Sequence, residues 1–425
     1  MFEVSITKII AGGHGLGRHE GRAVIVPGTA PGEIHRVRTV VEKKDFIEAR
    51  SVERLTDSPF RREPPCPYYG LCGGCALMHL EPATQLTAKR TILQESLRRA
   101  GYSDPVEKIE ASGSPELRYR TRLRFHVEGK GSRPLLGFRR RQRREVVDIE
   151  HCLLGSAALN EAWSGVRRLV GERPAFARHL EQVEFQESSV NPGRIVGRFL
   201  VRSIDGLRFL ERGGLSRWLD EGRLDGIVVS TSRRGPRVRL GSRSVAHSVS
   251  GFHLEQSSES FFQANRFLLE DLVSAVVPET SFDRAIDLYC GVGLFTLPLA
   301  RVAKRVFGVE TVASSIRDAR GNAKRAKLGN VRFRRMDAAR YLERIRLRVD
   351  DLVVADPPRG GLALETLEAI GGSSVRSFFY VSCDPPALAR DVARLQRHGF
   401  RIESLRLLDL FPNTYLFETV ARLTR

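Results

Sequence analysis

The sequence has no long uninterrupted hydrophobic run. Its most apolar long window, residues 285–303, is broken by a charged residue, two glycines and a proline: Asp287, Gly291, Gly293 and Pro298. Those residues suit a strand, a turn and a helix, and they exclude a membrane-spanning helix. The first ten residues, MFEVSITKII, lack the basic start and apolar core of a secretory signal. We therefore expect a soluble, cytoplasmic protein with no membrane partner.

Acidic residues are scarce relative to basic ones. The chain has 69 Lys and Arg against 50 Asp and Glu, a formal net charge of +19. Eleven of the basic residues lie between Arg118 and Arg144, a stretch that contains one acid, Glu128. A surplus concentrated in this way predicts a polyanionic partner, because each Lys or Arg that neutralises a phosphate releases counterions. Nucleic acid is favoured over a membrane surface or a charge scattered for solubility.

Cysteine is also sparse, but three of the six cysteines are clustered. Cys66, Cys72 and Cys75 lie within the short stretch CPYYGLCGGC. Disulfides are not expected in a cytoplasmic chain, so this spacing predicts a metal site instead. On spacing alone, thiolate ligands suit zinc or an iron–sulfur cluster.

The length of 425 residues predicts two or three domains. In residues 1–57, apolar and polar residues alternate at period two on either side of a Gly-rich turn, which predicts a small OB-like β-barrel. Such barrels often bind oligonucleotides, although a structural cap is nearly as consistent with the pattern. Residues 58–250 predict a central α+β domain, with a helix over 85–99. Residues 251–425 alternate buried strands and helices, which predicts an α/β, Rossmann-like domain with a doubly wound parallel sheet.

Within the central domain, residues 118–127 (RYRTRLRFHV) predict a strand with arginines along one face. The run FRRRQRR follows at 138–144. A charged outer face is normal for a half-buried strand, but this density exceeds what solvation requires. We therefore predict a surface that tracks nucleic-acid phosphates, formed by Arg118, Arg120, Arg122, Arg124 and the 138–144 run.

The stretch DRAIDLYCGVGLFTLPLA predicts a cofactor site. Gly291 and Gly293 follow a buried strand and allow close approach of a ligand to the backbone. A dinucleotide fingerprint would have a third glycine where Thr296 stands, so an NAD site is disfavoured. Later strands end in carboxylates at Glu310, Asp337 and Asp356, although a single acid of this kind is more often a helix N-cap. Together they suit a ligand with a ribose, an amino group and a sulfonium, namely S-adenosylmethionine.

Cys383 follows the apolar strand FFYVS and precedes the helix start Asp384-Pro385-Pro386. A free cysteine is usually buried and inert. Here the strand end and the helix N-terminus favour a reactive thiolate, and Glu418 is a candidate base or acid. Amino-methylating enzymes often carry an aromatic residue at the position of Arg359, so carbon methylation is favoured. Attack of a thiolate on C6 of uracil makes C5 nucleophilic enough to accept a methyl group.

These motifs together resemble the S-adenosylmethionine-dependent RNA uridine C5-methyltransferases. The resemblance is narrower to the branch with an N-terminal TRAM barrel and an iron–sulfur cluster, typified by 23S ribosomal RNA enzymes. It covers nearly the whole chain and weakens between about 155 and 245. The motifs that carry it are Cys-x5-Cys-Gly-Gly-Cys at 66–75, SFFQAN, DLYCGVGLFTLPLA, ADPPRGG, VSCDP and FPNTYLFETVARL.

The resemblance implies roles for individual residues. Cys383 is the nucleophile that attacks C6, Glu418 the base that removes the C5 proton, and Asp356 orients the uracil. The S-adenosylmethionine contacts implied are Gln263, Tyr289, Gly291, Gly293, Leu294, Glu310, Asp337 and Asp356. The ligands implied for a [4Fe–4S] cluster are Cys66, Cys72, Cys75 and Cys152. The family often has Asn at the position of Leu294 and His at that of Asn413 or Tyr415.

Several alternatives remain open at this point. The substrate is expected to be 23S rRNA, with transfer RNA as the rival, and the target base must leave its stack. A non-catalytic RNA-binding protein and an NAD-dependent oxidoreductase are disfavoured. The cluster is expected to have a structural role rather than a redox-sensing one, and the protein is expected to be a monomer.

Overall fold

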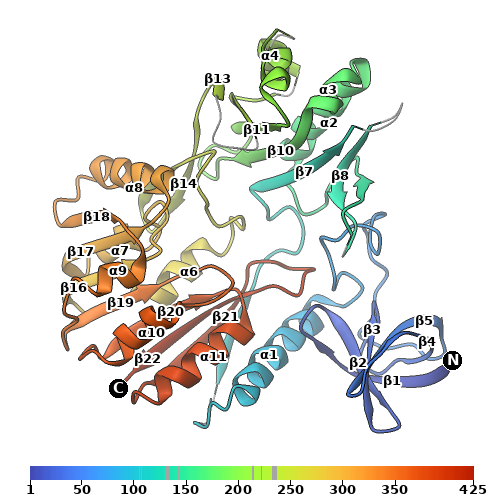
Figure 1. The fold of residues 1–425 in the computed structure, drawn as a ribbon, viewed down its shortest axis with the longest axis horizontal. Coiled ribbons are helices and arrows are strands. Elements are labelled where there is room, and N and C mark those ends of the chain that lie inside the picture. The colour runs from blue at the N-terminus through green and yellow to red at the C-terminus, as the bar shows by residue number, and fades with distance from the viewer. Residues whose placement is uncertain are drawn as a thin grey trace.

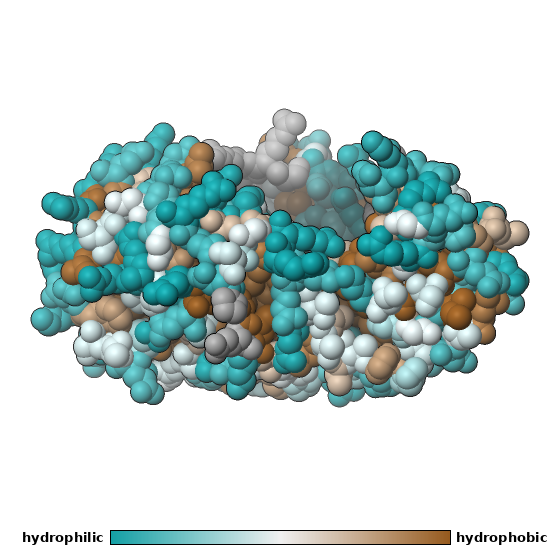
Figure 2. All heavy atoms as spheres, turned by 90° about the horizontal axis from the view of Figure 1, so that it is seen from below, coloured by the Kyte–Doolittle hydropathy of each residue, from teal (hydrophilic) through white to brown (hydrophobic). Residues whose placement is uncertain are grey.

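The computed structural model describes residues 1–104, 106, 108–129, 134–141, 143–212, 215–221, 223–231 and 237–425. Figure 1 shows three parts: an N-terminal barrel, a central sheet with helices on it, and a large C-terminal sheet with helices on its faces. Hydrophilic residues cover most of the face drawn in Figure 2, and hydrophobic residues lie mainly in the recesses between them. No helix among these residues is long and apolar enough to cross a membrane.

The N-terminal part is a closed five-stranded barrel, which confirms the predicted fold of this region. The alternating side chains of its strands fill the interior with small branched residues such as Val4, Ile6, Val24 and Val37. The strand order is β1-β2-β3-β5-β4. The strands are β1 (Phe2–Ile10), β2 (His14–His19), β3 (Arg22–Pro27), β4 (Ile34–Glu42) and β5 (Phe46–Arg54).

The chain then forms an irregular cysteine-rich segment, residues 58–81, which we call the knuckle. Helix α1 (Pro82–Arg99) follows and begins three residues before the predicted helix, with proline in its first turn, where no backbone donor is needed. This helix lies alongside α11 (Pro385–Gln396) in Figure 1. After α1, strand β6 (Ile109–Gly113) pairs in parallel with β21 (Arg401–Asp409).

Strand β6 therefore extends the C-terminal sheet and α1 packs against it, although the sequence predicts both in the central domain at 58–250. The apolar face of α1 explains this difference. Its buried residues Ile92, Leu93 and Leu97 belong to the same core as Phe378 and Leu405 of the C-terminal sheet. Burial of that face is available only against the later part of the chain.

The central sheet has seven strands in the order β13-β12-β11-β10-β7-β8-β9. In its core Phe125 and Trp163 stack, with 3.8 Å between their ring centroids, and Phe185 packs edge-on against both. The strands are β7 (Arg122–Glu128), β8 (Leu135–Arg139), β9 (Val146–Asp148), β10 (Leu180–Glu187), β11 (Ile195–Val201), β12 (Gly226–Thr231) and β13 (Arg237–Gly241). The helices are α2 (Ala157–Glu172), α3 (Ala175–His179), α4 (Ile204–Arg212) and α5 (Leu215–Glu221).

The predicted arginine strand at 118–127 is only partly correct, because the strand begins at Arg122. Arg118 precedes it with a positive φ of 54°. Arg122 and Arg124 both form ion pairs with the buried Glu184, at 2.9 and 2.6 Å. Since Glu184 lies opposite Arg124 in the β10–β7 ladder, the register of the sheet engages two of the predicted arginines with one buried carboxylate. In the run at 138–144, Gln142 lies outside the described residues.

The C-terminal sheet has the order β18-β17-β16-β19-β20-β22-β21-β6. Strands β16 to β20 are parallel, and β22 runs antiparallel between β20 and β21. This confirms the predicted doubly wound α/β fold. The strands are β16 (Phe282–Leu288), β17 (Ala303–Glu310), β18 (Val331–Arg335), β19 (Asp351–Ala355), β20 (Ser377–Ser382) and β22 (Glu418–Thr424). A hairpin of β14 (Ser244–Val249) and β15 (Phe252–Ser257) precedes it. The helices are α6 (Leu269–Val276), α7 (Thr296–Leu299), α8 (Ala313–Arg325), α9 (Ala338–Leu342), α10 (Leu364–Gly371) and α11.

Candidate active site

The carboxyl ends of β19 and β20 and the start of β22 form one corner of the C-terminal sheet. Asp356 directly follows β19, and Cys383 directly follows β20, its neighbour in the sheet. Strand β22 is antiparallel to β20 and pairs Thr419 with Ser382. Glu418, the first residue of β22, is therefore brought beside Cys383. The three residues for which the sequence predicts catalytic roles lie together.

The Cys383 thiol is half-buried among negatively charged groups. Burial, repulsion from Glu418 and repulsion from Asp356 raise its pKa to about 11, although the guanidinium of Arg359 opposes the shift through attraction and a hydrogen bond. A thiol in this setting is protonated at neutral pH. It becomes a nucleophile only when a partner removes the proton or when more positive charge approaches.

The pKa values of both carboxyl groups in this corner are raised. Burial raises the pKa of Asp356 to about 7. Burial and repulsion from Asp356 raise the pKa of Glu418 well above its usual range, while Arg359 counteracts this. Within the described part of the chain, Glu418 Oε2 is buried and has no hydrogen-bond partner. Acid–base groups shifted toward neutral pH are typical of functional sites.

The turn after β16 forms the predicted cofactor cradle. Tyr289, Gly291 and Gly293 all have positive φ, at 64°, 53° and 96°. A Cβ atom added to Gly291 would meet nothing within 4 Å, so the space above this turn is open. The Gly291 N–H donates to Glu310 Oε2 at 3.3 Å, which joins the ends of β16 and β17. The remaining oxygen of Glu310 accepts from the N–H groups of Thr311 and Val312, at 2.6 and 2.8 Å.

The other predicted cofactor contacts are distributed around this turn. Asp337 caps α9 by accepting from the N–H groups of Ala339 and Arg340. Its negative charge and that of Glu310 also contribute to the raised pKa of Tyr289. Gln263 is buried in the loop that precedes α6. Leu294 differs from the others because its side chain belongs to the apolar core, so only its backbone is available to a ligand.

Two residues near the reacting groups were missed by the sequence analysis. Asp287 is fully buried on β16; its Oδ2 accepts from the Thr296 hydroxyl, whereas its Oδ1 has no partner among the described residues. Burial raises its pKa to about 7, and the carboxylates of Asp356 and Glu310 add to the shift. The second is Arg359, which the sequence analysis treated only as a missing aromatic. A buried acid within the strand motif DLYCG was the available signal for Asp287.

The residues around the β16 turn fit S-adenosylmethionine. The open space at Gly291, the carboxylate of Glu310 and the unpartnered oxygen of Asp287 provide close backbone approach and acceptors for hydroxyl and amino groups. When bound, this molecule supplies a methyl group from its sulfonium.

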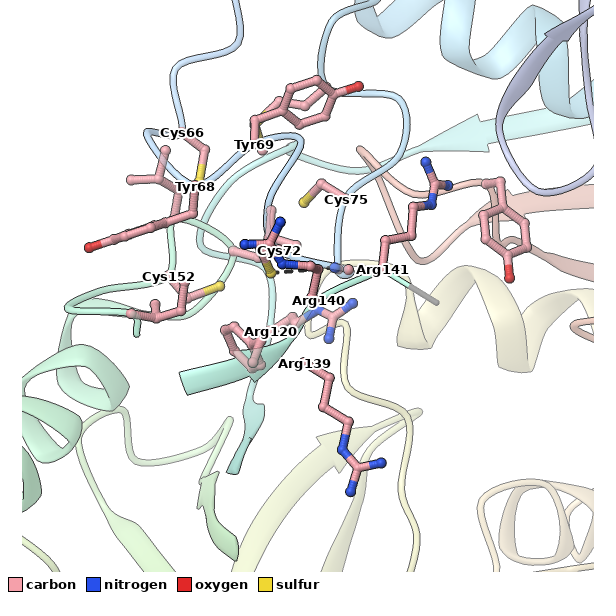
Figure 3. A pocket seen from close by; sticks show the side chains of 18 of the residues that line it. Cys66, Tyr68, Tyr69, Cys72, Cys75, Arg120, Arg139, Arg140, Arg141 and Cys152 are labelled. Carbon is pink, nitrogen blue, oxygen red and sulfur yellow. Dashed lines mark hydrogen bonds between the residues drawn. The ribbon is translucent and has the colours of Figure 1, made fainter. Parts of the chain in front are cut away.

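The four cysteines of the predicted metal site line one cavity of about 500 Å³. Figure 3 shows their sulfur atoms directed into a shared space, three from the knuckle and one from Cys152 of the central domain. Burial and the neighbouring thiols raise the pKa of Cys72 to about 11. Among the described residues, no group of three or more His, Cys, Asp or Glu side chains is arranged to hold a metal ion.

Arginines line one side of this cavity, as Figure 3 also shows. Arg120, Arg139, Arg140 and Arg141 line it, and Arg141 donates to the carbonyl oxygen of Gly12 in the barrel at 2.7 Å. The pKa of Arg120 is raised above its usual range: burial lowers it, but Tyr119 and the nearby thiols outweigh that effect. The sequence analysis assigned these arginines to RNA, whereas the structure directs Arg120 toward the cysteines.

Comparison with known proteins shows which family this chain resembles. Residues 81–425 match the family described as tRNA (Uracil-5-)-methyltransferase, and residues 1–44 match the TRAM domain. An "Uncharacterized RNA methyltransferase" of Aquifex aeolicus is 34% identical, covering 99% of this chain and 98% of its own length. The 23S rRNA (uracil(1939)-C(5))-methyltransferase RlmD of Chromohalobacter salexigens is 33% identical, covering 99% of this chain and 89% of its own.

A solved structure has the same fold along the whole chain. It is the Pyrococcus abyssi tRNA (uracil-54, C5)-methyltransferase in complex with S-adenosyl-L-homocysteine, with a TM-score of 0.77, 24% identity and complete coverage of both chains. The family match spans more than half of this chain, and the two relatives match it along almost all of its length. The chain therefore belongs to the tRNA (uracil-5-)-methyltransferase family of RNA uracil-5-methyltransferases, with an N-terminal TRAM domain and an S-adenosylmethionine-dependent methyltransferase fold.

Proposed function

We propose that this enzyme methylates C5 of a specific uridine in 23S rRNA through a covalent bond between Cys383 and C6 of the uracil. The observation that carries the chemistry is the meeting of Cys383, Glu418 and Asp356 at one corner of the sheet. The substrate is supported by the relatives named as 23S rRNA enzymes, whose sequences align with this chain from end to end.

In the first step, the Cys383 thiol loses its proton to solvent and its sulfur forms a bond to C6. The electron pair of the C5=C6 double bond moves toward C5 and O4, which makes an enolate. Arg359 is the positive group beside the thiol, so it stabilises the thiolate before the attack. C5 then bonds to the methyl carbon while the bond from that carbon to the sulfonium breaks.

In the second step, Glu418 accepts the proton from C5. The electron pair of that C–H bond restores the C5=C6 double bond, and the bond between C6 and the Cys383 sulfur breaks. The enzyme regains its thiolate, and Glu418 later releases its proton to solvent. Glu418 must be ionised when it acts. Because its pKa is raised, the ionised carboxylate is a stronger base than an ordinary glutamate. Asp356 hydrogen-bonds the uracil in this proposal, and burial raises the pKa of its carboxyl group.

The test is methyl transfer to defined RNAs. Purified enzyme, labelled S-adenosylmethionine and either 23S rRNA or transfer RNA lacking 5-methyluridine are combined, and the modified nucleotide is mapped by mass spectrometry. We expect 5-methyluridine in 23S rRNA. If only transfer RNA is labelled, the proposed substrate is wrong but methylation of uracil C5 still holds. Label on a base other than uracil would contradict both the substrate and the reaction.

We also propose that Cys66, Cys72, Cys75 and Cys152 hold a [4Fe–4S] cluster with a structural role. In support, four thiols surround one cavity instead of meeting at a point, and arginines offset the negative charge that thiolate ligation brings. Anaerobically purified protein should contain about four iron atoms and absorb near 400 nm, roughly as cysteine-ligated clusters do. A colourless protein with one zinc would overturn this assignment. The expectation of a monomer stays a prediction.

A further inference from the structure

The loop between β21 and β22 leads directly into Glu418 and is attached to the knuckle through one residue, Asn413. Its carbonyl oxygen accepts from the backbone N–H groups of Ala76 and Leu77, both at 2.9 Å. These two residues directly follow Cys75. Asn413 has a φ of 66°, a conformation that Asn tolerates better than most residues.

The side chain of Asn413 forms three further hydrogen bonds and is fully buried. Its Oδ1 accepts from Gln85 Nε2 at 3.1 Å and from Arg62 Nη2 at 3.2 Å. Its Nδ2 donates to the carbonyl oxygen of Glu116 at 2.9 Å. In return, the backbone N–H of Asn413 donates to Gln85 Oε1 at 2.7 Å. One residue thus connects the loop to the knuckle, to α1 and to the segment before β7.

Glu418 depends on this loop for its position. Its Oε2 is buried without a hydrogen-bond partner in the described part of the chain, so polar contacts at that oxygen do not orient the carboxylate. The backbone on both sides of Glu418 must do so: β22 pairs it with Leu408 of β21, and the loop leads into it. That loop is held at its other end by Lys89, which donates to Asp409 Oδ1 at 2.6 Å and to the carbonyl oxygen of Phe411 at 3.2 Å.

We propose that Asn413 is a positioning residue for the base Glu418, and that it makes removal of the C5 proton depend on the knuckle. The proposal rests on the proposed function, because it assigns Asn413 to the second step of that reaction. Nucleophilic attack belongs to Cys383, which β20 and α11 hold independently of this loop. Loss of the Asn413 contacts should therefore slow the second step more than the first.

The variant Asn413→Gly tests this, because glycine keeps the positive φ and the carbonyl oxygen while it removes the side chain. Two RNAs separate the steps. In RNA with 5-fluorouridine at the target, fluorine cannot leave as a cation, so the covalent protein–RNA adduct accumulates without any action of the base. With this RNA, we expect Asn413→Gly to form the adduct within about twofold of the wild-type rate.

With ordinary RNA, the turnover of Asn413→Gly should fall roughly 10- to 100-fold, and the fraction of enzyme trapped as adduct should rise. Gln85→Leu, which changes α1 and leaves the loop sequence intact, should shift both quantities in the same direction. Asn330→Ala is the matched control. It also removes two hydrogen bonds to backbone carbonyls, those of Ala300 and Ala303, at the opposite end of the sheet. It should lower the melting temperature without accumulation of adduct.

A general structural role would lower adduct formation and turnover equally, and that outcome would overturn the proposal, as would unchanged turnover in both variants. Failure of the proposed function looks different. In that case the wild-type enzyme forms no adduct with the 5-fluorouridine RNA, or Cys383→Ala still transfers methyl groups.

Discussion

Cys383 and Glu418 are neighbours because β20 and β22 are antiparallel and pair Ser382 with Thr419. The parallel strand β20 ends where β22 begins, so the proposed nucleophile and the proposed base, 35 positions apart in the sequence, share one corner. The carboxylate of Glu418 raises the cost of ionising Cys383, and the carboxylate of Asp356 raises the cost of ionising Glu418. These repulsions act in the absence of substrate, and they can be measured.

Removal of the nucleophile should abolish methyl transfer. Cys383→Ala is expected to lower turnover by a factor on the order of 10³ or more, since no other group can bond to C6. S-adenosylhomocysteine should bind within about twofold of the wild-type affinity by calorimetry, because its site lies at β16 and β17. Cys290→Ala is the control for loss of a thiol, since Cys290 is buried in the core. Equal losses of turnover in the two variants would contradict the assignment.

Removal of the base should trap the reaction after methyl transfer. Glu418→Gln is expected to lower turnover by about 10²- to 10⁴-fold, while a covalent protein–RNA adduct appears as a slow band in a denaturing gel. Glu403→Gln is the matched control, because Glu403 lies on the adjacent β21 and forms an ion pair with Arg422 at 3.1 Å on the protein surface. Absence of adduct in Glu418→Gln would mean that the glutamate acts before bond formation.

The reactivity of Cys383 with iodoacetamide should report the charges around it. Its pKa of about 11 means that the alkylation rate rises with pH from neutral to alkaline conditions. Glu418→Gln removes a negative charge, so the midpoint of the pH profile should move down. Arg359→Gln removes the positive charge, so the midpoint should move up. Mass spectrometry of the peptide that contains Cys383 provides the measurement, and shifts of the same sign in both variants would contradict the geometry.

Acid should weaken the junction between barrel and knuckle through Glu33. Burial opposes ionisation of Glu33, but hydrogen bonds from Arg61, His35 and the Ala30 N–H outweigh it and lower its pKa from 4.5 to about 2. A folded-state pKa below the unfolded value adds stability that is present above pH 4.5 and is lost as the pH falls toward 2. In urea unfolding followed across this range, Glu33→Gln should be less stable at pH 7 and should depend less on pH. An unchanged pH slope would contradict the shift.

The buried pair of Lys89 and Asp409 should show strong coupling. Burial lowers the pKa of Lys89 and raises that of Asp409, so each group needs the other to stay charged. Lys89→Met should therefore lower the free energy of unfolding by about 3–5 kcal/mol, since Asp409 would remain buried and unpaired. The double variant Lys89→Met/Asp409→Leu should recover part of this loss in denaturant titrations. Additive losses would show that the two groups are independent.

Much of the architecture was predictable from local patterns. The alternation in residues 2–27 is enough to predict the barrel strands, because one face of each strand must be buried. The ends of β17, β19 and β20 were predictable for the same reason, since an apolar run stops where a polar residue meets the edge of the sheet. The candidate cysteine, glutamate and aspartate could thus be named from the sequence.

Other features required contacts between distant segments. The ion pairs of Arg122 and Arg124 with Glu184 depend on the pairing of β7 with β10, which no pattern near the arginines reveals. The attachment of α1 and β6 to the C-terminal sheet depends on which apolar face is available. Asn413 lies in the motif FPNTYLFETVARL, but the motif does not reveal its partners, which lie about 300 or more positions earlier in the chain.

The sequence by itself determined which chemical groups exist and on which element most of them lie, because strand alternation and turn chemistry are local properties of the chain. The tertiary structure alone decided which groups meet. It brought Glu418 to Cys383, directed Arg120 toward the cysteines and joined Asn413 to the knuckle. The physical reason is that strand register and burial are set by the packing of the whole chain, and these long-range contacts determine the charge and the hydrogen bonds around each group.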